Sequence, residues 1–120
     1  MRICLDTNVL IDLAKGKQDV IEKLKDLPHR TVCITSITVF EFLRGSDDRF
    51  VDSFEVLELD GPCARTAAGI FKKLEKSGKK PSVVDTLIAS CCISNRVPLL
   101  TRDRSFEGFK KFGLELKLLS

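Results

Sequence analysis

The chain has 120 residues, of which 43% are apolar and 31% charged, and its formal net charge is +3. This length suits one ordinary domain with a hydrophobic core, so we expect a single domain over residues 1–120. The composition is typical of a soluble globular protein and excludes a disordered chain. No apolar run reaches the roughly 20 residues that span a bilayer, and no signal peptide is recognisable, so we expect a cytoplasmic protein.

The cysteines and the single histidine argue against zinc and disulfide chemistry. The cysteines have apolar neighbours, show no CxxC spacing and are odd in number, so we expect reduced thiols in the core at Cys4, Cys33, Cys63, Cys91 and Cys92. His29 lies in a polar turn and cannot build a zinc site with such scattered cysteines. We therefore assign His29 no role.

In the first half of the chain a strand–helix unit occurs twice. The apolar run 3–5 stops at Asp6 and is followed by apolar residues at helical spacing, which predicts a strand and then a helix. An amphipathic segment over 18–26 precedes a β-branched run at 31–35, which predicts a second strand. The apolar spacing that follows predicts a helix ending near Gly45.

The second half continues the alternation of strands and helices. Residues 47–52 are ambiguous. In chain order the pattern then predicts a strand over 54–59, a long helix from Ala64 that stops at Gly78, a helix carrying Val84 to Cys91, a buried strand over 97–101, a helix over 103–112 and a final strand over 114–118. Such alternation predicts an α/β fold with an open parallel sheet and helices on both faces. Sheets of this kind bind their ligands at the carboxyl ends of the strands.

Four carboxylates lie where this rule places the chemistry. Asp6 and Asp103 directly follow strands and precede helices, so each could equally be a plain helix N-cap. Glu41 lies three residues after Thr38, at the spacing of a capping box, and three before Arg44, at the spacing of a surface ion pair.

Asp85 also has a capping interpretation, because it lies three residues after Ser82. Its helix neighbours at later turns are apolar, however, and they are Ile88, Ala89 and Cys92. A carboxylate beside an apolar stripe with no basic partner on its own helix is costly unless a cation compensates it. Two other acids are not beside an apolar stripe without a basic partner. Asp12 is matched by Lys15, and Asp19 by Lys23, at the spacing of neighbours on a helix surface, which predicts solvated ion pairs.

The convergence of four acids at one sheet edge predicts a metal site. Carboxylates forced close together repel one another and take up protons unless a divalent ion holds them ionised. Ligation by oxygen alone favours Mg²⁺ or Mn²⁺ over zinc. The chain has 17 acidic residues, so 13 remain outside these four, against 20 basic residues. This excess of positive charge suits a polyanionic substrate. A surface of mixed solvated charge would give the same count.

The segments around these acids resemble the motifs of the PIN-domain family. The opening run 3–11 is similar to the first motif of that family, and Glu41 within 39–42 resembles its second acid. Residues 84–89 around Asp85 resemble the third motif, and 99–106 around Asp103 the fourth, including the Thr-x-Asp sequence and the Phe that follows it. The likeness runs almost the whole length of the chain, and no acid of the pattern is missing.

In length and detail the chain is most similar to VapC-type toxins of toxin–antitoxin pairs. This resemblance implies a three-layer α/β/α fold with a mostly parallel sheet of about five strands, a Mg²⁺ or Mn²⁺ site and hydrolysis of RNA. It also implies a homodimer and a small antitoxin that occupies the active cleft. In the mechanism so implied, Asp6, Glu41 and Asp85 bind one metal ion, and Asp103 completes that site or helps to hold a second ion. The products would carry 5′-phosphate and 3′-hydroxyl ends.

Several polar residues near the acids are candidates for supporting roles. Thr7, Asn8 and Thr101 could orient the carboxylates or a water molecule, or could be ordinary turn and cap residues. Basic residues that flank the motifs could hold RNA phosphates, or could be solvated surface residues: Arg44, Lys79, Lys80, Arg102 and Arg104.

Three other functions remain open at this stage. A housekeeping PIN nuclease of RNA maturation would have the same fold but no antitoxin. A phosphoryl-transfer receiver or phosphatase also gathers aspartates at a sheet edge, but needs a supporting lysine after a late strand, where this chain has Arg102. A noncatalytic RNA-binding module would bind nucleic acid without turnover.

Overall fold

The computed structural model describes residues 1–28, 31–47 and 49–119. Its centre is a sheet of five parallel strands in the order β3-β2-β1-β4-β5. The strands are β1 (Arg2–Leu5), β2 (Thr31–Thr35), β3 (Glu55–Leu57), β4 (Leu99–Thr101) and β5 (Leu116–Leu118). The helices are α1 (Thr7–Ala14), α2 (Gln18–Asp26), α3 (Ser36–Arg44), α4 (Gly61–Lys76) and α5 (Val83–Asn95), with 3-10 helices η1 (Arg49–Ser53) and η2 (Arg104–Phe112).

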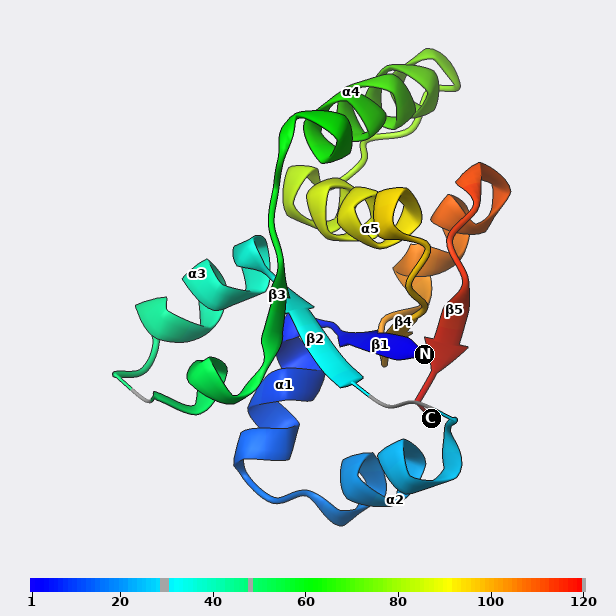
Figure 1. Cartoon of the computed structure of the whole chain (residues 1–120). Coiled ribbons are helices and arrows are strands. Elements are labelled where there is room, and N and C mark those ends of the chain that lie inside the picture. The colour runs from blue at the N-terminus through cyan, green and yellow to red at the C-terminus, as the bar shows by residue number, and fades with distance from the viewer. Residues whose placement is uncertain (29–30, 48, 120) are drawn as a thin grey trace.

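Alternating side chains on the central strands build two cores, one on each face of the sheet. Cys4 and Cys33 pack with residues of α4, α5 and η2, whereas Ile3, Leu5 and Ile34 pack with residues of α1 and α2. Figure 1 shows α4 and α5 on one side of the sheet and α1 and α2 on the other. The predicted α/β fold with three layers and about five strands is therefore confirmed.

Buried thiols make up part of this interior. All five cysteines are free and buried, as the sequence predicts. Cys4 pairs in register with Cys33 of the neighbouring strand, so both point to the same face of the sheet. No helix in the described ranges is long and apolar enough to cross a membrane. The predicted turn at His29 lies outside the described residues.

The structure corrects several element boundaries. The strands predicted over 54–59, 97–101 and 114–118 are shorter, and the ambiguous segment leads into η1. The helix predicted over 103–112 is the 3-10 helix η2, which starts at Arg104. Its three phenylalanines explain the tighter winding, because Phe106, Phe109 and Phe112 are spaced three residues apart and a 3-10 helix has three residues per turn. Phe106 and Phe109 are buried and Phe112 packs against the same core.

Candidate active site

The four predicted acids come from separate elements whose ends meet at the carboxyl-terminal edge of the sheet. Asp6 follows β1, and Asp103 follows β4, the direct neighbour of β1. Glu41 lies on α3, which starts directly after β2, the other neighbour of β1. Asp85 is the third residue of α5. The crossing order of the strands thus brings to one place residues that are up to 97 positions apart.

Asp6 is buried, and both of its carboxylate oxygens are held. Oδ1 accepts a hydrogen bond from the backbone N–H of Thr7 at 2.8 Å, so Asp6 is the N-cap of α1. Oδ2 accepts from the hydroxyl of Thr101 at 2.7 Å. Burial raises the pKa of Asp6, the two hydrogen bonds lower it, and the negative charges of Asp103 and Glu41 raise it further. Asp6 can therefore cap α1 and belong to an acidic site at the same time.

A relay of three threonine hydroxyls orients Glu41. The hydroxyl of Thr7 donates to Oε1 of Glu41 at 2.6 Å and lies 3.0 Å from the hydroxyl of Thr38. Thr35 in turn donates to Thr38 at 3.4 Å. The N-cap of α3 is Thr35, which accepts from the N–H of Thr38, so the capping box predicted for Thr38 and Glu41 is wrong.

Thr35 and Thr38 are the positions that sequence reasoning missed. Both are fully buried, and their side chains carry the relay into the site. Their spacing of three residues directly after a strand is the signal of an N-cap, and it would have placed the helix start one turn earlier.

The surroundings of Asp85 oppose ionisation of its carboxyl group. Ser82 caps α5 by accepting a hydrogen bond from the N–H of Asp85 at 3.1 Å, a contact that does not involve the Asp85 carboxylate. Burial raises the pKa of Asp85 to about 6, and the negative charges of Asp6, Asp103 and Glu41 add to the rise. All four carboxylates are therefore within electrostatic reach of one another.

Asp103 is linked to Asp6 through Thr101. The Thr101 hydroxyl, which donates to Asp6, accepts from the backbone N–H of Asp103 at 3.0 Å. The Asp103 carboxylate caps η2 by accepting from the N–H of Ser105 at 2.8 Å. Thr7 and Thr101 thus contact carboxylates directly, whereas Asn8 is an exposed residue beside them.

The basic residues predicted to flank the site differ in how firmly they are held. The guanidinium of Arg102 bonds to Asp12 at 2.9 Å and to Asp19 at 2.8 Å, and Lys17 contacts Asp12 at 3.3 Å. The predicted pairs of Asp12 with Lys15 and of Asp19 with Lys23 are therefore wrong. Asp12 and Asp19 instead bind Arg102 and so connect the turn after β4 to α1 and α2.

The remaining basic candidates are Arg44, Arg104, Lys79 and Lys80. Arg44 lies over the ring of Phe40 on α3, with its guanidinium carbon 5.5 Å from the ring centroid. Arg104 makes an exposed contact with Glu107 at 3.5 Å. Lys79 and Lys80 line a cavity whose wall includes Asp85. Of these candidates, the two lysines therefore share a cavity with a predicted catalytic acid.

The donor set fits a hard divalent cation. It consists of carboxylate oxygens only, and burial together with the charges of the other acids raises the pKa of Asp85, a cost that such a cation relieves. Over the described ranges, no three Asp, Glu, His or Cys side chains are already arranged as ligands of one ion. The hydrogen bonds of Asp6, Glu41 and Asp103 leave each carboxylate with unused lone pairs for an ion.

Comparison with known proteins identifies the class to which this site belongs. The PIN domain family model matches residues 3–111. The chain therefore belongs to the PIN-domain family.

Relatives specify the type of PIN protein. The chain is 40% identical over 94 residues to ribonuclease VapC3 of Methanocaldococcus jannaschii, covering 75% of this chain and 97% of that protein. It is 26% identical over 120 residues to the tRNA(fMet)-specific endonuclease VapC of Shigella flexneri, covering 89% and 91%. It is thus a VapC-type toxin endoribonuclease of a toxin–antitoxin system, which sets aside the housekeeping, phosphatase and noncatalytic alternatives.

Solved structures agree on the fold. VapBC2 of Rickettsia felis, bound to a DNA fragment from its promoter, contains a similar chain with a TM-score of 0.82 and 24% identity, and all of both chains is covered. Other structural neighbours include VapBC and FitAB toxin–antitoxin complexes.

Proposed function

We propose that Asp6, Glu41, Asp85 and Asp103 form the active centre of a Mg²⁺- or Mn²⁺-dependent hydrolysis of RNA phosphodiester bonds. One observation carries this proposal: Asp85 is partly buried at the start of α5, and burial together with the negative charges of the three other carboxylates raises its pKa. A fold retains such a costly arrangement where a function requires it. A purely structural role for Asp85 would need a cationic partner, and the ion pairs of the described residues give it none.

The protein residues position the reacting groups. Thr7 and Thr101 fix the carboxylates of Glu41 and Asp6, so these oxygens need no reorganisation when substrate binds. A divalent ion held by the four acids would lower the pKa of a bound water molecule and neutralise charge on the scissile phosphate. In-line attack by water would leave 5′-phosphate and 3′-hydroxyl ends. This route needs no pair of histidines, in agreement with a chain that has one.

Cleavage of RNA by purified protein tests this proposal. Wild type and Asp85→Asn are incubated with tRNA and ribosomal RNA in Mg²⁺, in Mn²⁺ or in excess EDTA. We expect cutting by wild type in either metal, none in EDTA, and loss of activity of at least about a hundredfold in the variant. Asp26→Asn, in the exposed last turn of α2, is the matched control and should cut normally. Metal-dependent cutting by Asp85→Asn at the wild-type rate would refute the proposed centre.

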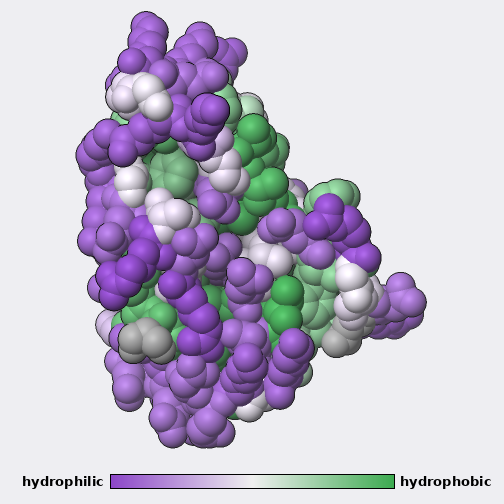
Figure 2. Space-filling model, turned by 180° about the vertical axis from the view of Figure 1, so that it is seen from behind, coloured by the Kyte–Doolittle hydropathy of each residue, from purple (hydrophilic) through white to green (hydrophobic). Residues whose placement is uncertain are grey.

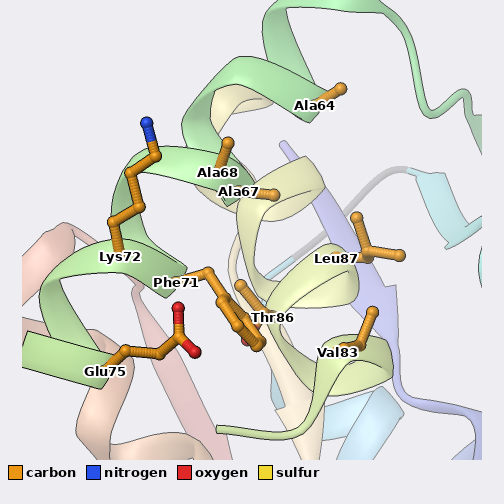
Figure 3. Close-up of a pocket in the computed structure, with 9 residues that line it drawn as sticks. All are labelled: Ala64, Ala67, Ala68, Phe71, Lys72, Glu75, Val83, Thr86 and Leu87. Carbon is orange, nitrogen blue, oxygen red and sulfur yellow. The ribbon is translucent and has the colours of Figure 1, made fainter.

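We infer that a small antitoxin protein covers this site. An apolar groove of about 450 Å³ lies between α4 and α5, and Figure 3 shows Val83 and Leu87 of α5 lining it opposite alanines of α4. Val83 and Thr86, which flank Asp85 on α5, both belong to this groove. An antitoxin segment could therefore place apolar side chains in the groove and a basic side chain among the carboxylates. Ala68→Glu should weaken inhibition by the antitoxin without slowing RNA cleavage, whereas Lys73→Glu on the same helix should not.

We also infer a homodimer through α3 and α5. Large apolar side chains outside the antitoxin groove are exposed on both helices, namely Phe40, Leu43 and Val84. Figure 2 shows hydrophobic surface at the notch between the projection formed by α3 and the part of the molecule formed by α4 and α5. Exposed apolar surface of this kind marks an interaction site.

A cytoplasmic location, which the sequence predicts, agrees with an RNA substrate and with five free thiols.

A further inference from the structure

A cavity of about 410 Å³ shares Asp85 with the acidic site. Its volume lies in the range of about 300–1,000 Å³ that is typical of small-molecule sites. Its wall comes from the end of α4, the turn between α4 and α5, and the middle of η2. The lining residues are Leu74, Lys79, Lys80, Pro81, Ser82, Asp85, Ser105, Gly108 and Phe109.

The turn after α4 fixes two lysines at this cavity. Gly78 has a φ of +82°, a left-handed conformation that suits glycine at the end of a helix. The N–H of Lys79 then donates back to the carbonyl of Leu74 at 3.0 Å, so the chain folds over the helix end. Pro81 stiffens the segment before the Ser82 cap of α5. The backbone that carries Lys79 and Lys80 is therefore held in place at the cavity.

Lys79 and Lys80 are available cations. The ion pairs of the described residues include Arg2, Lys17, Arg102, Arg104 and Lys117 but neither of these lysines. Both side chains are exposed. Two ammonium groups that make no ion pair among the described residues, in a cavity that includes Asp85, would attract an RNA phosphate that approaches the site, because lysine binds phosphate by charge.

The floor of the cavity suits the rest of a nucleotide. Leu74 and Phe109 are each 5% exposed and, with Pro81, provide apolar surface for a base or ribose. The hydroxyls of Ser82 and Ser105 lie in the same wall and can donate hydrogen bonds to a base edge or a 2′-hydroxyl. Apolar contact, hydroxyl donors and cations therefore occur together next to a predicted catalytic acid.

We propose that this cavity is a subsite for the RNA nucleotide adjacent to the bond that is cut, with Lys79 and Lys80 holding its phosphate. The inference rests on the proposed function, because it takes the four acids as the place of cleavage. The subsite fixes the register of the RNA strand and contributes to the choice of the bond that is hydrolysed.

Gly108 offers a direct way to fill the subsite. A Cβ atom added there meets no heavy atom within 4 Å, and the backbone of Gly108 is not in the left-handed region. Gly108→Leu therefore adds apolar bulk at the cavity wall without backbone strain. Gly69→Leu is the matched control, since Gly69 is an exposed glycine of α4 with equally open surroundings and lies outside the cavity lining.

Binding is measured by fluorescence anisotropy with a labelled single-stranded RNA of mixed sequence, in excess EDTA so that no cutting interferes and Asp85 stays in the cavity wall. We expect Gly108→Leu to weaken binding about tenfold and Gly69→Leu to leave it unchanged. Lys79→Ala and Lys80→Ala should each lower the slope of log affinity against log salt by about 0.7, as expected for one lost phosphate contact on a single strand. Lys76→Ala, on an exposed position of α4, should not.

Cleavage by the otherwise wild-type protein gives the second readout. Gly108→Leu should raise KM about tenfold, leave kcat within about twofold and shift the preferred cleavage positions. Equal RNA affinity of Gly108→Leu and Gly69→Leu would overturn the subsite, even if wild type cuts RNA in Mg²⁺. Failure of wild type to bind the RNA at all in EDTA would overturn it as well. A wild type that binds through the cavity but never cuts in Mg²⁺ or Mn²⁺ would refute the proposed active centre and the place of the cavity beside a cleaved bond, and would leave only RNA binding by the cavity.

Discussion

Hydroxyl groups of threonine decide how the acids of the site are held. Thr101 donates to Asp6 and accepts from the N–H of Asp103, so a single oxygen links the carboxyl ends of two neighbouring strands. Thr7 does the same between α1 and α3 by contacting Glu41 and Thr38. The three hydroxyls Thr7, Thr38 and Thr101 are buried, where an unsatisfied polar group is costly, so these contacts stabilise the fold and orient the acids together.

Removal of the Thr7 hydroxyl should lower activity more than stability. Thr7→Val keeps the shape of the side chain but frees Glu41 to rotate, and loss of an orienting group typically costs about 10- to 100-fold in activity or metal affinity. We expect a tenfold or larger loss in kcat, a higher Mg²⁺ requirement, and rescue of both by Thr7→Ser. Thr31→Val, at the start of β2 and at the opposite strand end, is the control. An unchanged Mg²⁺ dependence in Thr7→Val would contradict the relay.

Asp85 should make the free protein less stable as pH rises. Its folded-state pKa of about 6 lies above the ordinary value of 3.8, so the folded state binds this proton more tightly than the unfolded state does. The stabilisation by the protonated form is complete below about pH 4 and is lost as pH rises through 6. In EDTA, Asp85→Asn should therefore be more stable than wild type by about 1–2 kcal/mol at pH 8, after allowance for solvent screening.

Urea unfolding followed by circular dichroism at pH 4, 6 and 8 measures this difference. The gain of Asp85→Asn should shrink towards zero at pH 4, and Mg²⁺ at pH 8 should stabilise wild type but not the variant. Asp26→Asn should show neither behaviour. A gain that is constant across this pH range would mean that the substitution acts through packing and not through charge.

At the scale of elements, one arginine joins three segments that surround the site. Arg102 lies between Thr101 and Asp103 and bonds to Asp12 of α1 and Asp19 of α2. The Asp12 side chain is only 14% exposed, so loss of Arg102 leaves a largely buried carboxylate that is paired with Lys17 alone. The sequence suggested an RNA contact for Arg102, but the geometry favours a positioning role for this side chain.

Arg102→Met should therefore destabilise the fold more than it weakens RNA binding. We expect a loss of roughly 1 kcal/mol in unfolding free energy, smaller at high salt, because the pairs are partly exposed. The salt dependence of RNA binding should stay as in wild type, in contrast to Lys79→Ala. Arg104→Met, which removes an exposed pair, should change neither quantity. A reduced salt slope in Arg102→Met would restore the RNA contact that the sequence suggested.

The sequence predicted the elements better than their ends and partners. Hydrophobic alternation places Ile3, Cys4 and Leu5 in a strand, and the stripe on α5 in a helix, because burial enforces those periods. The 3-10 winding of η2 was readable in the spacing of Phe106 and Phe109, but a span of nine residues is uncommon for such a helix. The partners of Asp12 and Asp19 were not readable, since Arg102 is more than 80 residues away from either of them.

At the scale of the whole molecule, the strand order explains why Asp6, Glu41 and Asp103 meet, and Asp85 joins them from the start of α5. Because β1 is central and flanked by β2 and β4, the segments after these three strands share one edge. That order cannot be derived from periodicity, which fixes the face of a side chain but not its neighbour. The rule for parallel sheets nevertheless predicted the correct edge for all four acids.

The exposed apolar surface of α3 and α5 leads to a prediction about assembly. These helices contact each other, and Phe40 and Val84 are 62% and 38% exposed on them. If the surface is buried between two copies of the chain, a charge at either position should split the dimer, because an unpaired charge is costly in an apolar interface. Phe40→Glu and Val84→Glu should each halve the mass measured by light scattering after size exclusion at micromolar concentration.

Leu59→Glu provides the control for added charge, since Leu59 is also an exposed apolar residue but lies outside α3 and α5. This variant should keep the mass of wild type, and all three variants should keep the wild-type far-ultraviolet circular dichroism. Loss of the dimer with retained RNA cleavage would show that each copy carries a complete active centre, as expected if all four acids come from one chain. A dimer that survives both Phe40→Glu and Val84→Glu would place the interface on another surface and would leave the apolar side chains of α3 and α5 to a different partner.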